Sequence, residues 1–158
     1  MTYHSVLHGR YSQPGQAYFV TACTQHRLPL FTDLRMARIV CLEIKTLHDC
    51  GDVLSVAWVI MPDHLHWLIQ LRETRALPTV MRYLKARSAQ QINVALSRSG
   101  PVWQQGYYEH AIRQDEDLRQ TAEYIISNPQ RAGLAVEKEQ YPFWDAIWLW
   151  NDADIPDL

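Results

Sequence analysis

Two histidines stand one residue apart in an otherwise apolar segment, "VIMPDHLHWLIQL", residues 59 to 71. Residues two apart on a strand project to the same face, so His64 and His66 can present two imidazoles to one ion while Leu65 points away. A structural metal site usually has four protein ligands, so two histidines predict a site with open positions. The alternative is a pair of buried histidines that are hydrogen-bonded to their neighbours, and the H-x-H pattern alone does not exclude it.

A second pair of candidates lies in "AEYIISNP", where Tyr124 and Asn128 are four residues apart. A helix places such a pair on one face, about a turn from each other. A tyrosine beside a metal can act as a covalent nucleophile, and an amide oxygen is a suitable ligand for Mg²⁺ or Mn²⁺. Against this, a tyrosine on an amphipathic helix is usually packed, and an Asn before a Pro usually ends a helix.

The segments around the histidines predict a sheet. The segment "AYFVTACT", residues 17–24, is rich in strand-forming residues, and two apolar strands, 53–61 and 64–71, meet at a Pro62-Asp63 turn as an antiparallel hairpin. Between the first strand and this hairpin, the spacing of apolar residues predicts a helix, with Asp33 as its N-terminal cap and Gly51 as its stop.

The rest of the chain predicts two more helices around a fourth strand. Pro78 opens a helix that continues to about residue 96, and residues 102–113 return to the sheet. A third helix is expected from a cap at Asp115 to Asn128, because Pro129 cannot continue it. The order predicts an α+β fold of the ferredoxin-like, split βαβ type: an antiparallel sheet, helices on one face, and an appended helix that carries the tyrosine.

Composition indicates one globular domain over residues 1–158, with a short aromatic-rich C-terminal extension from about residue 134. The chain has 158 residues, of which 47% are hydrophobic, enough for a single core. No apolar stretch approaches a membrane helix and no signal pattern opens the sequence, so we expect a cytoplasmic protein without a membrane partner. Cys23, Cys41 and Cys50 fit neither a disulfide framework nor a cysteine zinc site and are expected to be reduced thiols in or near the core.

The net charge of −2 offers no global attraction for nucleic acid, so DNA contacts must come from local clusters. One candidate is the run of residues 81–100, which holds Arg82, Lys85, Arg87 and Arg98 without an acidic residue. An ordinary solvated helix face explains the same run equally well.

Three motifs in order, "MPDHLHWLIQL", "WQQGYYEHAIR" and "EYIISNPQRAGL", resemble those of the single-tyrosine HUH transposases, and specifically the REP-associated tyrosine transposases. The resemblance runs from about residue 18 to about residue 144. It implies that His64, His66 and Asn128 hold a divalent ion, Mg²⁺ or Mn²⁺, and that Tyr124 is the catalytic nucleophile. The implied reaction cuts single-stranded DNA beside a hairpin, a palindromic repeat, through a covalent 5′-phosphotyrosine intermediate.

Other expected DNA contacts are less specific. Gly15 and Tyr18 loosely match a glycine-turn-aromatic signature that helps these relatives bind the base of the hairpin. Arg113 and Arg131 are placed by sequence to reach phosphates beside the cut, although arginines with no role are equally compatible with the pattern. Trp103, Tyr107 and Tyr108 are candidates for stacking on unpaired bases, with core packing as the alternative, and His110 is expected to cap a strand.

Two other functions remain compatible with the sequence. One is a hairpin-binding regulator of the same fold without catalysis, and the other is a metal-dependent hydrolase that uses a bound water. The resemblance implies a bacterial, nucleoid-associated protein that works as a monomer or a homodimer.

Overall fold

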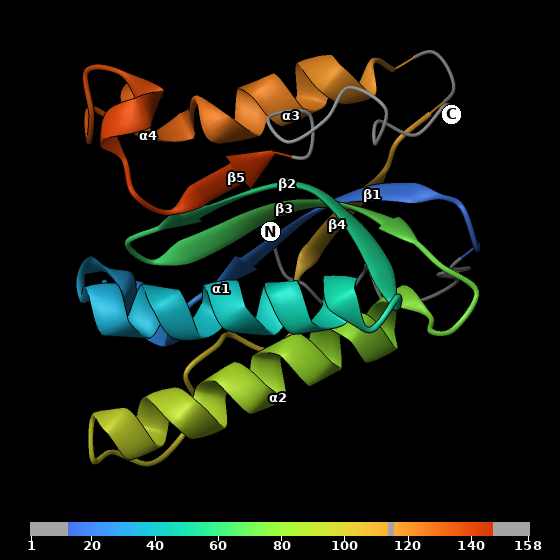
Figure 1. Ribbon diagram of the computed structural model, residues 1–158. Helices are drawn as coiled ribbons and strands as arrows, with labels where there is room; N and C mark the ends of the chain where they lie inside the picture. The colour runs from blue at the N-terminus through green and yellow to red at the C-terminus, as the bar shows by residue number, and fades with distance from the viewer. Residues whose placement is uncertain (1–12, 114–115, 147–158) are drawn as a thin grey trace.

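The computed structural model describes residues 13–113 and 116–146. Five strands and four principal helices follow one another along the chain (Figure 1): β1 (Ala17–Cys23), α1 (Leu34–Asp49), β2 (Val53–Met61), β3 (His64–Leu71), α2 (Leu77–Ala95), β4 (Tyr108–Ala111), α3 (Leu118–Ile126), α4 (Asn128–Arg131) and β5 (Trp144–Ala146). Three short 3₁₀ helices lie in the connections, η2 (Gln25–Arg27), η3 (Leu30–Thr32) and η4 (Lys138–Gln140).

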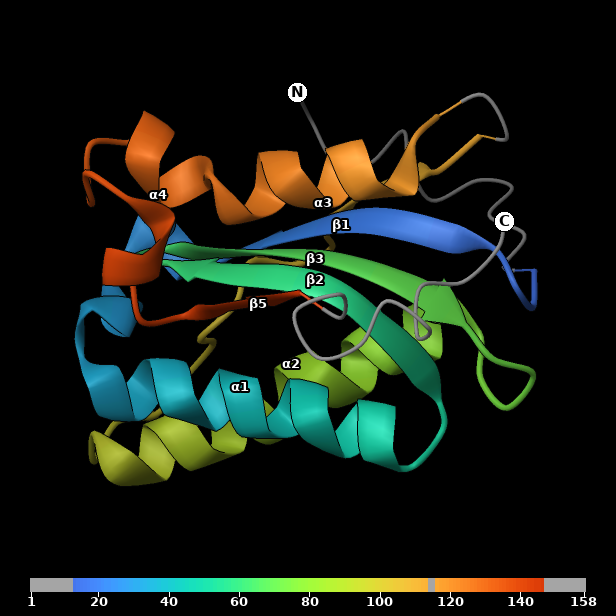
Figure 2. The same ribbon diagram turned by 45° about the horizontal axis from the view of Figure 1, so that its top comes forward.

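The strands form one sheet in the order β4-β1-β3-β2-β5, and every neighbouring pair is antiparallel. Helices α1 and α2 cover one face of this sheet, and α3 crosses the other face (Figures 1 and 2). The first four strands therefore have the predicted ferredoxin-like order, and the tyrosine-bearing helix is an addition on the opposite side.

Local signals in the sequence account for the first helix and the central hairpin. The Asp33 side chain accepts the backbone N–H of Arg35 at 2.9 Å, which satisfies one of the free donors at the start of α1. Gly51 follows the end of α1 with a φ of +77°, a conformation that glycine adopts without strain. Strands β2 and β3 occupy the predicted ranges and are joined by the Pro62-Asp63 turn, and β3 is the middle strand of the sheet.

Alternate residues of β3 face different cores. Leu65, Trp67 and Ile69 pack with α1 and α2, whereas Leu68 packs with Ile125 and other apolar residues of α3. Because side chains of a strand alternate between faces, His64 and His66 share the face of Leu68 and look toward α3. The sequence pattern thus places the histidine pair on the side that carries the added helix.

The structure corrects the predicted third helix. Helix α3 ends at Ile126 rather than Asn128, and Pro129 lies in the first turn of α4, where the missing N–H of proline is tolerated. The N-terminal cap of α3 is Asp117, whose carboxylate accepts the N–H of Arg119 at 2.8 Å. The expected cap, Asp115, lies outside the described residues.

Two strand predictions also need correction. The expected strand 102–113 forms ladder pairs only over Tyr108–Ala111, with one isolated bridge between Trp103 and Thr24. Strand β5 was not predicted, because three residues carry too little periodic pattern; it forms by pairing with β2.

Within the described ranges, no helix is both long enough and apolar enough to cross a bilayer.

Candidate functional site

The two histidine rings lie against each other on the α3 side of the sheet. Their centroids are 4.7 Å apart and the rings are nearly perpendicular. Both side chains are half-buried, and the ring of Phe19 on β1 lies 5.3 Å from that of His66. Strand geometry therefore brings two imidazoles together without help from any distant segment.

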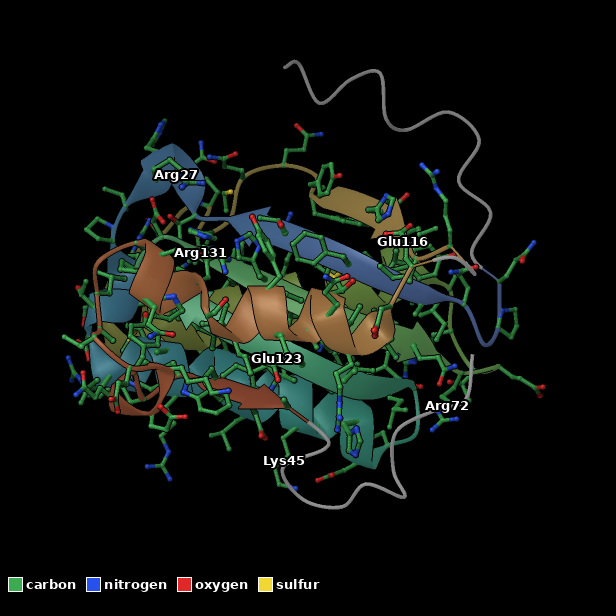
Figure 3. All side chains as sticks on the ribbon, turned by 90° about the horizontal axis from the view of Figure 1, so that it is seen from above. Arg27, Lys45, Arg72, Glu116, Glu123 and Arg131 are labelled. Carbon is green, nitrogen blue, oxygen red and sulfur yellow. The ribbon has the colours of Figure 1, made fainter. Side chains whose placement is uncertain are left out.

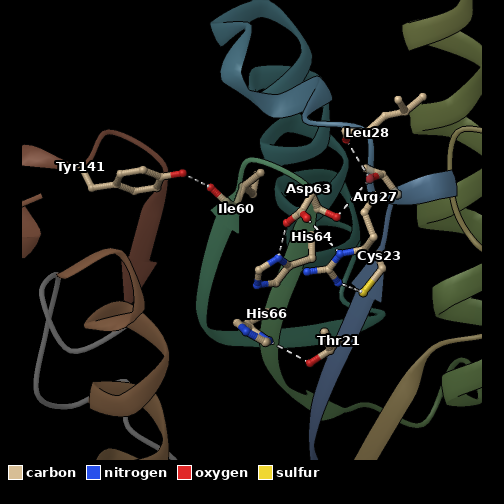
Figure 4. Close-up of polar contacts among 10 residues, drawn as sticks. Thr21, Cys23, Arg27, Leu28, Ile60, Asp63, His64, His66 and Tyr141 are labelled. Atoms are coloured by element: carbon tan, nitrogen blue, oxygen red, sulfur yellow. Dashed lines mark hydrogen bonds and ion pairs between the residues drawn. The ribbon is translucent and has the colours of Figure 1, made fainter. Parts of the chain in front are cut away.

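Each imidazole is held at Nδ1 by a different partner (Figure 4). His64 Nδ1 lies 2.7 Å from Oδ1 of Asp63, and His66 Nδ1 lies 2.8 Å from Oγ1 of Thr21, its register neighbour on β1. Among the described residues neither Nε2 atom has a hydrogen-bond partner. A histidine that donates its Nδ1–H to an oxygen presents the lone pair of Nε2, which is the arrangement of many metal ligands.

The electrostatics around the pair keep His66 neutral. Burial lowers the pKa of His66 to about 3, and the charges of His64, Arg131 and Arg27 act in the same direction. Burial by itself raises the pKa of Asp63. The hydrogen bond from His64 and the charge of Arg27 lower it by a larger amount, so the net shift is downward. At neutral pH the site therefore contains a neutral imidazole and an ionised carboxylate, the forms that serve metal binding.

Tyr124 lies on α3, the helix that crosses the histidine face of the sheet, and Arg131 interacts with both Tyr124 and His66. The guanidinium of Arg131 lies 3.9 Å from the centre of the Tyr124 ring and donates to the carbonyl oxygen of Tyr124 at 2.6 Å. The same guanidinium contacts Ser127 Oγ, and its charge depresses the pKa of His66. The Tyr124 ring is 57% exposed, so its phenol is accessible from solvent.

Asn128 lies at the junction between α3 and α4, where Arg131 contacts Tyr124 and Ser127. It is the first residue of α4, directly after Ser127, the C-cap of α3, and its side chain is half-buried. Tyr124 and Asn128 are therefore carried by two helices with a break between them, and not by one continuous helix.

The donor set fits a divalent ion with open coordination positions. Two imidazoles are available whose Nε2 atoms have no hydrogen-bond partner among the described residues, and the Asn128 amide lies at the junction of α3 and α4. Among the described residues, no three His, Cys, Asp or Glu side chains form a cluster that could hold a metal by themselves. A ligand set of two histidines and the amide of Asn128 matches this chemistry, as oxygen ligands suit Mg²⁺ and Mn²⁺.

The basic residues of α2 lie behind the sheet, away from the histidines. Lys85 is partly buried and donates to the carbonyl oxygens of Gln104 and Gly106, both at 2.7 Å. Arg87 pairs with Glu43 of α1 at 2.9 Å, while Arg82 is exposed beside the groove between α2 and residues 101–107. Two of these three cations thus have structural roles within the helix layer.

The aromatic candidates also divide into residues buried in the helix-covered core and one that is exposed. Tyr18 is 5% exposed and belongs to the core under α1 and α2, and Gly15 forms the turn before it with a φ of +80°. Trp103 is also 5% exposed and donates from Nε1 to Ser88 Oγ at 2.9 Å. Tyr107 is half-buried and packs against that core. None of these three rings offers a free face comparable with that of Tyr108.

Strand β4 brings other candidates to the histidine side. Tyr108 is 48% exposed and meets the edge of the Phe19 ring at 6.3 Å, next to His66. His110 Nε2 lies 2.9 Å from a carboxylate oxygen of Glu116, just before α3, rather than capping the strand. Arg113 is largely exposed, and its backbone N–H donates to the same carboxylate at 3.0 Å. In Figure 3, Glu116 and Arg131 mark opposite ends of the tyrosine helix.

Sequence reasoning missed three residues that surround the histidines: Thr21, Arg27 and Asp63. Asp63 was visible beside His64, but its position in a turn explained it without further function. Thr21 follows from strand pairing, which the sequence does not give residue by residue. Arg27 is 36 positions from Asp63 and depends on an unusual turn, so no local pattern indicated it.

Comparison with known proteins identifies the family of the chain. The family model described as "Transposase IS200 like" matches residues 12–128, about three quarters of the chain. The chain belongs to this family. The matched region contains strands β1 to β4, both histidines, the whole of α3 and Asn128. It stops just before Arg131, whose contacts to the tyrosine helix are therefore a feature beyond the family match.

Members of this family that are similar to the chain include named REP-associated tyrosine transposases. The one from Escherichia coli K12 is 28% identical over 137 residues, which cover 85% of this chain and 78% of that protein. A Haemophilus influenzae relative with a name of the same type is 32% identical over 99 residues, and the match spans only 56% of its length. A solved structure of a REP-associated tyrosine transposase bound to a REP hairpin superimposes with a TM-score of 0.71 at 25% identity, covering 87% of this chain and 80% of that one.

Proposed function

We propose that the protein is a metal-dependent single-stranded DNA endonuclease and transesterase that cuts beside hairpin DNA. Tyr124 is the nucleophile, and His64, His66 and Asn128 hold a divalent ion, Mg²⁺ or Mn²⁺. The observation that carries the proposal is the position of Arg131, which stacks on the Tyr124 ring while its charge acts on His66. An exposed phenol and the two imidazoles therefore lie on the same side of the sheet.

The residues divide the chemistry between them. A divalent ion at the histidines would polarise a phosphate oxygen and offset charge in the transition state. The phenol oxygen of Tyr124 attacks the phosphorus, a bond from that oxygen to phosphorus forms, and the bond from phosphorus to the 3′-oxygen breaks. The phenol proton passes to solvent, and the 3′-oxygen takes up a proton and leaves as a hydroxyl. The product is a 5′-phosphotyrosine, which conserves the bond energy for rejoining.

Arg131 has a second part in this proposal. Its guanidinium already bonds the carbonyl oxygen of Tyr124 and Ser127 Oγ, so it holds the end of α3 against α4. An exposed guanidinium at that position also suits a DNA phosphate beside the cut. Tyr108 and Arg113 extend the same face across β4 as further candidate DNA contacts, and Tyr108 supplies an aromatic surface for an unpaired base.

Hairpin DNA is proposed as the partner because a similar structure, that of a REP-associated tyrosine transposase, contains a REP hairpin. Palindromic repeats of the host genome are therefore the first substrates to test. A bacterial, nucleoid-associated protein that works as a monomer or a homodimer fits this partner.

The deciding experiment incubates the protein with single-stranded hairpin oligonucleotides labelled at the 3′ end, in Mn²⁺ or Mg²⁺ and in chelator, and resolves the products on a denaturing protein gel. Wild type should give a label at the mobility of the protein. Tyr124→Phe and chelator should each abolish this adduct. Tyr108→Phe is a matched control, because it removes another exposed phenol on the same side of the sheet and should leave the adduct in place.

The other outcomes identify the alternatives. Free cut DNA without an adduct, unchanged in Tyr124→Phe, would show a hydrolase that uses a bound water. Hairpins that bind tightly but remain uncut in every metal would show a non-catalytic regulator of the same fold. An adduct that persists in Tyr124→Phe would mean that another residue is the nucleophile.

A further inference from the structure

We propose that Asp63 and Arg27 are positioning residues that fix the ring of His64 for metal binding, and that an unusual left-handed turn exists to aim Arg27 at Asp63. The inference rests on the proposed role of His64 as a ligand. It adds two residues that neither the sequence motifs nor the family match assign.

The three side chains form a continuous chain from solvent to the metal site (Figure 4). Arg27 Nε donates to Oδ2 of Asp63 at 2.9 Å, and Asp63 Oδ1 lies 2.7 Å from His64 Nδ1. Each carboxylate oxygen therefore has its own partner, which fixes the plane of the carboxylate. A carboxylate held in this way orients the imidazole and selects the tautomer whose Nε2 is free.

Backbone contacts hold the segment that carries Arg27 against the turn that carries Asp63. Thr24 is fully buried, and both its N–H and its hydroxyl donate to the carbonyl oxygen of Asp63, at 2.9 and 3.1 Å. The N–H of Phe31 donates to the carbonyl oxygen of Pro62 at 3.0 Å. Hydrogen bonds from Thr24 and Phe31, which lie outside the hairpin, therefore hold the Pro62-Asp63 turn. The position of the Asp63 carboxylate does not depend on the hairpin alone.

The turn itself is strained. His26 and Arg27 have φ values of 56° and 55°, in the left-handed region that side chains other than glycine rarely adopt. Such strain persists where surrounding contacts over-determine it, and it is concentrated at functional sites. Here the turn places the Arg27 guanidinium between Asp63 and Cys23, with Nη1 2.7 Å from the sulfur.

The second histidine supplies an internal comparison. His66 is held by the neutral hydroxyl of Thr21, on a different strand, and among the described residues the Thr21 side chain makes no hydrogen bond to Asp63 or Arg27. Removal of Asp63 should therefore release His64 and leave His66 in place. Thr21→Val should do the reverse.

The first test uses the metal-free protein. Nitrogen NMR of the histidine rings should show His64 protonated at Nδ1 in the wild type. Asp63→Ala should shift this signal toward a mixture of tautomers, whereas the His66 signal stays unchanged. An unchanged His64 signal in Asp63→Ala would overturn the proposal, whatever the protein does with metals.

The second test measures Mn²⁺ affinity by calorimetry, after circular dichroism has shown that each variant is folded. Loss of an outer partner of a metal ligand typically weakens affinity about 10- to 100-fold, and we expect this range for Asp63→Ala and a smaller loss, roughly 3- to 10-fold, for Arg27→Gln. Arg35→Gln is the matched control, since Arg35 pairs with Asp33 at 2.7 Å but lies at the start of α1. It should change the affinity less than about twofold.

The outcomes separate this inference from the proposed function. If wild type binds Mn²⁺ and the Asp63 and Arg27 variants bind it equally well, the positioning role is wrong while the metal site stands. If wild type binds no Mn²⁺, the metal part of the proposed function fails, and the tautomer measurement still decides whether Asp63 fixes His64.

Discussion

The two faces of the sheet are built from the same strand but differ in what they contain. Beneath α1 and α2, the β3 side chains Leu65, Trp67 and Ile69 are fully buried and apolar. On the α3 side the alternate positions begin with His64 and His66, which are half-buried and bonded to polar partners, and continue with the buried Leu68. In the first half of β3, one face therefore supplies stability and the other supplies the candidate chemistry. Substitutions on adjacent residues of one strand should therefore affect different measurements.

The largest effect should come from Trp67→Ala. Trp67 is fully buried, and its Nε1 donates to Ser55 Oγ at 2.8 Å. Its removal leaves a cavity in the core and should lower the free energy of unfolding by about 3–5 kcal/mol. Urea denaturation measures this loss.

The neighbouring His66→Ala is the control for Trp67→Ala. It should lower the free energy of unfolding by less than Trp67→Ala does, about 0.5–2 kcal/mol, because the His66 ring is half-buried and leaves a smaller gap, yet remove the proposed metal-dependent cutting. If the two variants lost similar stability, the division of β3 into a stabilising face and a chemical face would be wrong.

A smaller effect, on DNA affinity, is expected at Tyr108, an exposed residue on the same side of the sheet as the histidines. Tyr108→Ala should weaken binding of single-stranded DNA by about 1–3 kcal/mol, the usual contribution of stacking one base on an aromatic ring. Fluorescence anisotropy in a Tyr124→Phe background measures affinity without cutting. Val94→Ala, an exposed apolar residue of α2, is the matched control and should leave affinity unchanged. Equal losses in both variants would contradict a specific role for Tyr108.

The smallest effect tests whether solvent and reagents reach the partly buried thiol of Cys41 on α1. Burial raises the pKa of Cys41 to about 12 from 9.0, so at pH 8 its reactive thiolate should be about a thousandfold rarer than for an unshifted thiol. Iodoacetamide followed by mass spectrometry should label the exposed Cys50 first, with Cys41 becoming reactive only as pH approaches 12. Rapid labelling of Cys41 at pH 8 would show that this layer opens readily.

Prediction from sequence was best where local patterns decide the structure. The hairpin of β2 and β3 has the expected bounds because apolar runs and the Pro62-Asp63 turn determine them. The end of α3 was misplaced because a proline is tolerated in the first turn of a new helix as well as being a helix terminator. Strand β5 depends on its pairing with β2, which the sequence does not reveal.

In the candidate site, too, the sequence predicted only what local spacing determines. His64 and His66 could be paired from spacing alone, whereas their partners come from β1 and from the loop after it. The basic run on α2 misled for a physical reason: Lys85 and Arg87 bond to carbonyl oxygens and to Glu43 within their own layer. A charge run in a sequence does not show which cations are already engaged in the fold.

The position of both histidines on one strand also makes the site sensitive to insertions and deletions. Loss of a single residue from β3 after Trp67, with the rest of the strand kept in register, would exchange the two faces of the first half of the strand, turning the imidazoles toward the apolar core and Leu65 and Trp67 toward α3. Loss of two residues would restore the alternation but shift His66 away from Thr21 along the strand. The length of this segment is therefore under tighter constraint than the identity of most residues within it.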